Sequence, residues 1–334
     1  MNDPHSAAIA RALSQIPDGA FEIKQYNTMD ADRPPLMKQI AAKTDGKGRI
    51  EVFRVFPGIA LSLHQYLANQ VNLHHAPQAT VLEINHCRQG RVGWTMRKGA
   101  AIYLGAGDLC LHSMASCADS EMTLPLNYYE GITVTVDLPK LETECPDILR
   151  EAAFSPGDIQ KKFCSEKTPI GIPFSKKTES IFSPLYEVNP ALRIPYYKLK
   201  VQEILLYLQE LRPRTEGALT QYGAQQTELI KRIRNFLVDN LDRRFTIEEL
   251  AKKYLINTSS LKTVFKAVYG APIASYVKEY RMQRAMQLLR ETDDSIAEIS
   301  RRIGYETQGK FTKAFKDSVR LLPTEYRRLY RKQP

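Results

Sequence analysis

The stretch SIAEISRRIGYETQGKFTKAFKDSVRLLPTEYR, residues 295–327, predicts two helices joined by a tight turn. Ser295 and Glu298 form a capping box, in which each side chain satisfies a backbone N–H that the first helical turn leaves bare. Gly304 can end that helix in the left-handed conformation, and Thr307 can cap the next one. An apolar stripe at helical spacing gives the first helix a buried face: Ile296, Ile299 and Ile303. The stretch therefore predicts a helix-turn-helix.

The second of these helices carries different chemistry on its two sides. Phe311 and Phe315 recur at helical spacing and predict a buried face. The outward side chains suit nucleic acid, because amides and hydroxyls read base edges whereas lysines contact phosphate. These outward residues are Gln308, Lys310, Thr312, Lys313 and Lys316.

A second copy of the pattern lies upstream, in residues 246–276, TIEELAKKYLINTSSLKTVFKAVYGAPIASY. It opens on its own capping box, Thr246 with Glu249. Aligning the copies, with one extra residue in the later turn, pairs Ile247 with Ile296, Leu250 with Ile299, Leu261 with Phe311, Phe265 with Phe315, Lys266 with Lys316 and Tyr276 with Tyr326. Between the copies, residues 275–289 contain no Gly or Pro and many strong helix formers. They predict one continuous helix that holds both copies at a fixed separation.

Spaced positions in both copies match one known family: Tyr276, Arg281, Ala285, Leu288 and Leu289, then IGY (303–305), FTKAFK (311–316) and PTEYR (323–327). With these motifs, roughly the last third of the chain resembles the DNA-binding domain of AraC/XylS-type bacterial transcription regulators. One position departs from the family pattern, because Arg320 stands where a glycine is usual and where the first copy has Gly270. The backbone after the final recognition helix is therefore expected to differ, and Arg320 could add a phosphate contact.

The resemblance implies which side chains of the two recognition helices face DNA. The first helix would present Ser259, Ser260, Lys262 and Thr263 to bases, and the second Gln308, Gly309, Thr312 and Lys313. The full predicted DNA-binding set adds Lys266, Thr307, Lys310 and Lys316. The partners implied by the resemblance are double-stranded promoter DNA and RNA polymerase.

The net charge of the chain is concentrated on this helical repeat. The 334 residues carry a formal net charge of +10. Residues 228–334 hold 23 Lys and Arg against 13 Asp and Glu, and the basic and acidic residues before them cancel. A run of charge alone is typical of a solvated face. Confined to a domain with two recognition-type helices, the surplus instead predicts an electrostatic footprint for phosphate.

Several other function classes lack their sequence signals. The N-terminus has no secretory pattern, and no run of about 18 apolar residues could span a bilayer, which predicts a cytoplasmic protein with no membrane partner. The five cysteines are odd in number and include no CxxC pair, which argues against a disulfide framework and a zinc cluster. A DNA-repair enzyme with such helices would need a four-cysteine metal site or an activated thiol. We therefore predict no catalytic residue, metal or cofactor.

The region from about Glu51 to Leu138 predicts a β-rich domain. Short apolar runs alternate there with turn signals such as Pro57-Gly58, and GITVTVDL (131–138) has the period of a half-buried strand. The pattern predicts an antiparallel barrel or sandwich. In many AraC/XylS-type regulators a cupin-like barrel that senses a small molecule occupies this place. The resemblance thus implies an effector domain, although the effector and its binding residues stay unknown and a barrel can be filled by its own side chains.

The single histidines of this region are interpreted as structural or surface groups, and its tryptophan as apolar filler. The histidines at 64, 74, 75, 86 and 112 do not assemble into the ligand spacing of a metal-binding cupin. Trp94 is the only tryptophan, and such a residue is more often large apolar filler than a stacking platform.

The predicted fold class is multidomain α and β, with an N-terminal antiparallel β barrel or sandwich (cupin-like) carrying helices and an all-α double helix-turn-helix at the C-terminus. The predicted parts are a leader (1–48), a β-rich sensor domain (49–190), an amphipathic helix (191–212), a linker (213–227) and the DNA-binding domain (228–332). The apolar stripe of helix 191–212 either packs on its own barrel or pairs with the same helix of a second chain, which would give a homodimer.

The predicted function is a sequence-specific DNA-binding transcription regulator controlled by a small-molecule effector. Activation is favoured over repression by the family resemblance alone. A second interpretation stays open, in which the chain is an effector-independent architectural DNA-binding protein whose β domain only mediates dimerisation.

Overall fold

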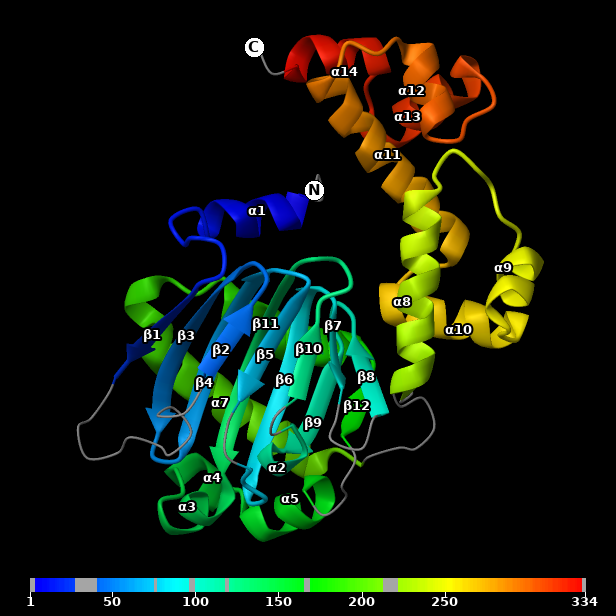
Figure 1. Cartoon of the computed structure of the whole chain (residues 1–334). Helices are drawn as coiled ribbons and strands as arrows, with labels where there is room; N and C mark the ends of the chain where they lie inside the picture. The colour runs from blue at the N-terminus through cyan, green and yellow to red at the C-terminus, as the bar shows by residue number, and fades with distance from the viewer. Residues whose placement is uncertain are drawn as a thin grey trace. The chain divides into compact units, whose positions relative to one another are not determined.

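The computed structural model describes residues 4–27, 41–74, 77–95, 100–117, 120–164, 169–212 and 222–331. The chain divides into two compact units, with the boundary between Ala224 and Gln225. The N-terminal unit contains the strands and the C-terminal unit is helical, as predicted (Figure 1). The finer domain boundaries stay predictions, and residues 213–221 of the predicted linker lie outside the described residues.

In the described part of the chain, two sheets form the N-terminal unit. The first has seven strands in the order β1 (Phe21–Tyr26), β3 (Lys47–Phe56), β4 (Ile59–Leu67), β11 (Tyr129–Asp137), β6 (Val81–Gly90), β9 (Leu109–Ser113) and β12 (Ile170–Ile172). The second has six in the order β13 (Tyr222–Gly223), β8 (Ala100–Leu104), β7 (Val92–Thr95), β10 (Ser120–Thr123), β5 (Gln70–His74) and β2 (Ala41–Thr44). The strand pairs are antiparallel except that β1 runs parallel to β3.

Strand β11 shows how the sequence assigns the two faces of the first sheet. Ile132, Val134 and Val136 are fully buried, whereas Thr133 and Thr135 between them are half-buried. The three apolar residues belong to the core that the sheet shares with helices. The threonines therefore face the second sheet, and the alternation predicted for this strand is confirmed.

A second apolar core fills part of the space between the sheets. It joins residues of the first sheet such as Val52 and Tyr66 to Val71, Trp94 and Met122 of the second. Trp94 is only 6% exposed, so its interpretation as apolar filler is confirmed. Two facing sheets with a shared core are the sandwich form of the predicted fold, and the cupin-like label stays a prediction.

Residues that the sequence assigned to a leader take part in the N-terminal unit. Helix α1 (Pro4–Ala12) and the turn after it bury Ile9, Leu13 and Ile16 with Tyr128. Strand β1 forms an edge of the first sheet. Its sequence, FEIKQY, is mostly polar and exposed, so only long-range pairing with β3 identifies it as a strand.

Helices cover the face of the first sheet that is turned away from the second. They are α3 (Leu138–Thr143), α4 (Asp147–Glu151), α5 (Pro156–Phe163), α6 (Lys176–Phe182), the 3-10 helix η2 (Ser183–Tyr186) and α7 (Arg193–Glu210). A second 3-10 helix, η3 (Pro190–Leu192), precedes α7 and has no buried residue. A short helix, α2 (Met114–Cys117), connects β9 towards β10.

Helix α7 corresponds to the amphipathic helix with two interpretations. Its stripe is fully or almost fully buried in the core shared with the first sheet: Tyr197, Val201, Ile204, Leu205 and Leu208. The rings of Phe53 and Tyr197 meet edge to face, with centroids 5.0 Å apart. The stripe therefore packs on the chain's own sheet, and pairing of this stripe with a second chain is the wrong alternative.

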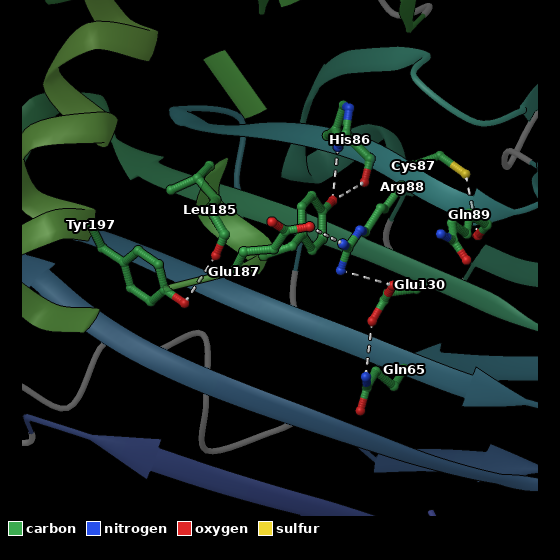
Figure 2. A network of polar contacts seen from close by, with 10 residues as sticks. Gln65, His86, Cys87, Arg88, Gln89, Glu130, Leu185, Glu187 and Tyr197 are labelled. Atoms are coloured by element: carbon green, nitrogen blue, oxygen red, sulfur yellow. Dashed lines mark hydrogen bonds and ion pairs between the residues drawn. The ribbon is translucent and has the colours of Figure 1, made fainter. Parts of the chain in front are cut away.

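A polar network ties the helix layer to the sheet (Figure 2). Arg88 on β6 contacts Glu130 on β11 at 3.4 Å and Glu187 after η2 at 3.0 Å. The guanidinium also lies 4.7 Å from the centroid of the Tyr186 ring. His86 Nδ1 is 2.8 Å from the Tyr186 hydroxyl oxygen. These contacts hold η2 and the residue after it over strands β6 and β11.

The described histidines have structural partners of this kind. His64 Nδ1 is 2.6 Å from the Tyr66 hydroxyl, and His112 Nε2 is 3.0 Å from Asn85 Nδ2. The side chains of residues 74 and 75 lie outside the described residues. Among the residues described, no group of three or more His, Cys, Asp or Glu is arranged to hold a metal ion, and no helix combines the length and apolar character that crossing a membrane requires.

The C-terminal unit consists of helices α8 (Ala224–Asp239), α9 (Ile247–Tyr254), α10 (Thr258–Tyr269), α11 (Ile273–Glu291), α12 (Ile296–Arg302), α13 (Gln308–Val319) and α14 (Pro323–Tyr330). Both predicted capping boxes are formed, at Thr246 before α9 and at Ser295 before α12. The predicted continuous helix is α11, which runs from one helix-turn-helix to the other (Figure 1).

Candidate nucleic-acid interface

The two recognition helices, α10 and α13, begin at side-chain caps. Thr307 Oγ1 accepts the backbone N–H of Lys310 at 3.2 Å, which confirms the predicted cap of α13. Asn257 Oδ1 accepts the backbone N–H groups of Ser259 and Ser260 at 2.8 and 3.4 Å and so starts α10. Sequence reasoning missed this second cap, although asparagine before a helix start is its usual signal.

The buried sides of the two recognition helices have the same geometry. Phe265 on α10 meets Tyr276 with ring centroids 5.5 Å apart and an interplanar angle of 79°. The aligned pair in the second copy, Phe315 and Tyr326, has centroids 5.6 Å apart and the same angle of 79°. The repeat seen in the sequence is therefore a structural repeat, in which aligned residues occupy equivalent places.

The opposite sides of α10 and α13 carry the predicted DNA-binding residues. Most of them are exposed: Ser259, Lys262, Thr263, Lys266, Thr307, Gln308, Gly309, Lys310, Lys313 and Lys316. Ser260 and Thr312 are half-buried. Lys310 forms an ion pair with Glu306 one turn earlier, and because both side chains are exposed this weak pair is readily exchanged for a phosphate. Each helix thus presents hydroxyl or amide groups beside lysines on one surface.

Gly309 has no visible structural need to be glycine. It lies in the first turn of α13 and does not have a positive φ, and a Cβ built on it meets no atom within 4 Å. Glycine inside a helix costs about 0.5–1 kcal/mol relative to alanine. Close approach of another molecule, such as a DNA backbone, is a physical reason for keeping this position free of a side chain.

The helix that precedes each recognition helix adds basic groups. Lys252 in α9 and Arg301 in α12 are aligned in the two copies and both are exposed. The next residue of each helix has an intramolecular partner, because Lys253 Nζ lies 3.5 Å from the centroid of the Phe236 ring and Arg302 forms an ion pair. Sequence reasoning missed Lys252, and its alignment with Arg301 is the signal that could have found it.

Each copy has two residues in the left-handed region, and only one of the two is glycine. In the first copy they are Leu255 (φ 51°) and Gly270 (φ 79°), and in the second they are Gly304 (φ 76°) and Arg320 (φ 64°). Arg320 closes α13 by donating its N–H to Lys316 O, as Gly270 does to Lys266 O in α10. The predicted change of backbone at Arg320 is therefore wrong, because the arginine adopts the conformation of the glycine.

The comparisons with known proteins concern this C-terminal unit. Residues 250–329 match a family model described as a helix-turn-helix domain. The Transposon Tn10 TetD protein of Escherichia coli is 31% identical over 102 residues, which cover 30% of this chain and 74% of TetD. The chain belongs to the AraC/XylS family of transcription regulators. Matched relatives such as RhaR are named as transcriptional regulators, in agreement with the prediction that the chain is not an enzyme.

Other AraC/XylS-type proteins match over the same part of the chain. The transcriptional activator RhaR of Mannheimia succiniciproducens is 32% identical over 91 residues, 27% of this chain and 33% of RhaR. The solved C-terminal domain of AraT, a response regulator from Geobacillus stearothermophilus, is 28% identical with a TM-score of 0.30, covering 31% of this chain and 88% of that domain. The match spans about a third of the length of the first curated relatives.

Proposed function

We propose that this chain is a sequence-specific DNA-binding transcription regulator, in which α10 and α13 read one duplex together. The observation that supports this proposal most is the repeated geometry of the two helices. Each buries one Phe–Tyr pair at the same angle and exposes polar and lysine side chains on the other side. The surplus of positive charge in residues 228–334 supplies the attraction to phosphate.

In the proposed complex, each recognition helix enters a major groove on the same side of the duplex. Two grooves facing one side are one helical turn apart, about 34 Å. The Gln308 amide and the Ser259, Thr263 and Thr312 hydroxyls are proposed to read base edges. Lys266 and Lys316, which are aligned in the two copies, are proposed to contact phosphate and to fix the register.

We further propose that the regulator is an activator that contacts RNA polymerase. The support is the family and the matched relative RhaR, which is named as a transcriptional activator. The position of the footprint relative to a transcription start would distinguish activation from repression.

A polar patch in the N-terminal unit supports control by a small-molecule effector. On the sheet face turned to the second sheet, two cross-strand rows contain Ser62, Thr133 and Asn85, then Thr135, Glu83 and His112. Thr133 Oγ1 donates to Asn85 Oδ1 at 2.7 Å, and Asn85 Nδ2 donates to His112 Nε2 at 3.0 Å. Thr133, Thr135 and Glu83 stay half-buried although β11 and β6 are interior strands of the sheet. An effector suited to these groups is a small molecule with several hydrogen-bonding atoms.

One observation favours the effector-independent architectural alternative. Apolar side chains, among them Trp94, Ile102 and Tyr129, already fill the other part of the space between the sheets. A thermal-shift screen of the full chain against polar metabolites separates the two proposals when DNA affinity is measured with and without each compound. A compound that raises the melting temperature and changes DNA affinity supports the effector.

A homodimer remains a proposal that needs a surface other than the buried stripe of α7. The outward side of this region exposes two leucines, Leu192 at 58% and Leu199 at 61%. Leu192 ends η3 and Leu199 lies on α7, and exposed leucines such as these are the side chains that a second copy of the chain would cover.

The test of DNA reading is an unbiased selection of duplexes by the full chain, followed by titrations on the selected and a scrambled duplex at two salt concentrations. Lys266→Ala should weaken binding to both duplexes by a similar factor and reduce the salt slope by about 1, because a phosphate contact is lost. Lys313→Ala should lose more affinity for the selected duplex than for the scrambled one. Lys278→Ala is the matched control, because this lysine is exposed on α11 outside both recognition helices.

Two results would contradict the proposal. A selection that returns no preferred sequence would reject sequence-specific reading. Unchanged affinity of both Lys266→Ala and Lys313→Ala, at both salt concentrations, would remove these lysines from the interface.

A further inference from the structure

A buried arginine lies where the two helix-turn-helix units join. Arg281, in the middle of α11, is 7% exposed. Its Nε donates to Leu241 O at 3.1 Å, and its Nη2 donates to Leu241 O at 2.8 Å and to Arg243 O at 2.7 Å. These carbonyls follow the C-terminal end of α8, where the helix dipole favours a cation. Because the guanidinium is buried and its hydrogen bonds go to carbonyls, Arg281 does not belong to the exposed DNA-facing surface.

The second helix-turn-helix rests on the same carbonyl. Gly304 forms the left-handed turn between α12 and α13. A Cβ on Gly304 would lie 2.2 Å from Leu241 O and 2.7 Å from Arg281 Nη2, so only glycine fits. The aligned residue of the first copy, Leu255, is 94% exposed and meets no such requirement. The close contact is therefore a feature of the junction and not of the repeated unit.

We infer that Arg281 is a positioning residue that fixes the two recognition helices relative to each other for joint binding to one duplex. Along the chain, the two helix-turn-helix copies are connected by helix α11. Arg281 adds a second connection between the copies. It lies on α11 and contacts both the loop after α8 and the turn before α13. Linking two binding modules raises overall affinity by about 10²–10⁴-fold, and this gain requires a geometry that lets both bind at once. The inference rests on the proposed function, since it concerns how the two readers cooperate.

The test compares DNA with two half-sites to DNA with one. The probes are the duplex selected by the wild-type chain, the same duplex with one half-site scrambled, and duplexes with base pairs inserted between the half-sites. Arg281→Met keeps an unbranched apolar stem and removes the donors. Gly304→Ala disturbs the contact from the other side, and Arg281→Lys restores the charge with fewer donors. Arg284→Met is the control, because Arg284 is exposed on the same helix.

We expect Arg281→Met and Gly304→Ala to lose about 10–100-fold in affinity for the intact duplex, while affinity for the single half-site stays within about twofold. Base pairs inserted between the half-sites should also reduce the affinity of both variants by a smaller factor than they reduce that of the wild type. Arg281→Lys should lie between the wild type and Arg281→Met, and Arg284→Met should keep the wild-type spacing preference.

Equal losses on the intact and single-half-site duplexes, or a retained wild-type spacing preference, would overturn the inference and leave Arg281 as a support of the fold only. If Arg281→Met does not fold, Arg281→Lys and Gly304→Ala provide the same comparison. A failure of the proposed function looks different, because the wild-type selection then returns no two-part sequence.

Discussion

Arg320 and Leu255 hold backbone angles at which residues other than glycine are strained. The left-handed conformation costs an L-residue roughly 1–2 kcal/mol. Each copy of the repeat has one glycine and one other residue in the left-handed conformation. In the first copy the glycine follows the recognition helix, and in the second copy it precedes that helix. Both strained residues are exposed, and Leu255 is 94% exposed. The two copies therefore store their strain at different ends of the recognition helix.

Replacing Arg320 with glycine should stabilise the C-terminal unit by about 1 kcal/mol, because the backbone strain is relieved. Urea denaturation followed by helical circular dichroism measures the change. Arg320→Ala is the control, since it removes the side chain but keeps the Cβ and so should give no such gain. A less stable Arg320→Gly would mean that contacts of the arginine side chain outweigh the strain. If Arg320 contacts phosphate, both variants should also bind DNA more weakly.

Gly309→Ala should separate stability from DNA binding. The added methyl group meets no atom of the chain within 4 Å, so the variant should gain about 0.5–1 kcal/mol from helix propensity. Its affinity for the selected duplex should fall, because the methyl group occupies the space that the DNA backbone approaches. Ser318→Ala, an exposed change in the same helix, should leave affinity unchanged. An unaltered affinity of Gly309→Ala would exclude close approach at this position.

At the scale of helices and strands, local sequence signals predicted the helices of the C-terminal unit. Contacts between residues far apart in the sequence determine the packing of α7, the pairing of β1 and the contact at Gly304. The Thr246 and Ser295 caps depend on residues three positions away, so the sequence contains all of the information. The amphipathic pattern of α7 shows that one face is buried but not what covers it. Strand β1 is recognisable only from its pairing with β3. For the same reason the alignment of the two copies predicted the exposed surfaces of α10 and α13, but not the contact at Gly304.

The packing of α7 predicts unequal effects of two substitutions in one helix. Ile204→Ala removes a fully buried side chain and should destabilise the N-terminal unit by about 2–5 kcal/mol. Leu199→Ala removes a side chain that is 61% exposed and should change stability by about 0.5 kcal/mol or less. Denaturation followed by the fluorescence of Trp94 measures both. Equal, small effects would contradict the burial of the α7 stripe against the sheet.

For the whole molecule, the two units differ in charge and in aromatic composition. The surplus of basic residues belongs to the C-terminal unit, and the single tryptophan belongs to the N-terminal unit. Trp94 fluorescence therefore reports unfolding of the N-terminal unit alone. The role of Arg281 was beyond sequence reasoning, because arginine is usually a surface residue and only the fold brings Leu241 and Gly304 to it.

The N-terminal unit should lose stability in mild acid through His86. Burial, and then the charge of Arg88, lowers the pKa of His86 to about 3, from an ordinary value of 6.5. Below about pH 6.5 the unfolded chain therefore binds a proton that the folded chain does not, and stability falls by about 1.4 kcal/mol per pH unit. His86→Phe keeps an aromatic ring beside Phe182 and removes the titration. Urea denaturation followed by Trp94 fluorescence should show a smaller pH slope for this variant, and an equal slope would exclude His86 as the source.

Because the two copies follow one another in a single chain, the molecule has a direction along DNA. A two-fold symmetric dimer reads a palindrome and cannot distinguish its two ends. Here Thr258 and Gln308 occupy the same place in the two recognition helices of one chain, so the contacts at the two ends of the site differ. Under the proposed mode of binding, one chain on a duplex points in a single direction. Turning its target site around would then reverse the order in which α10 and α13 lie along the promoter.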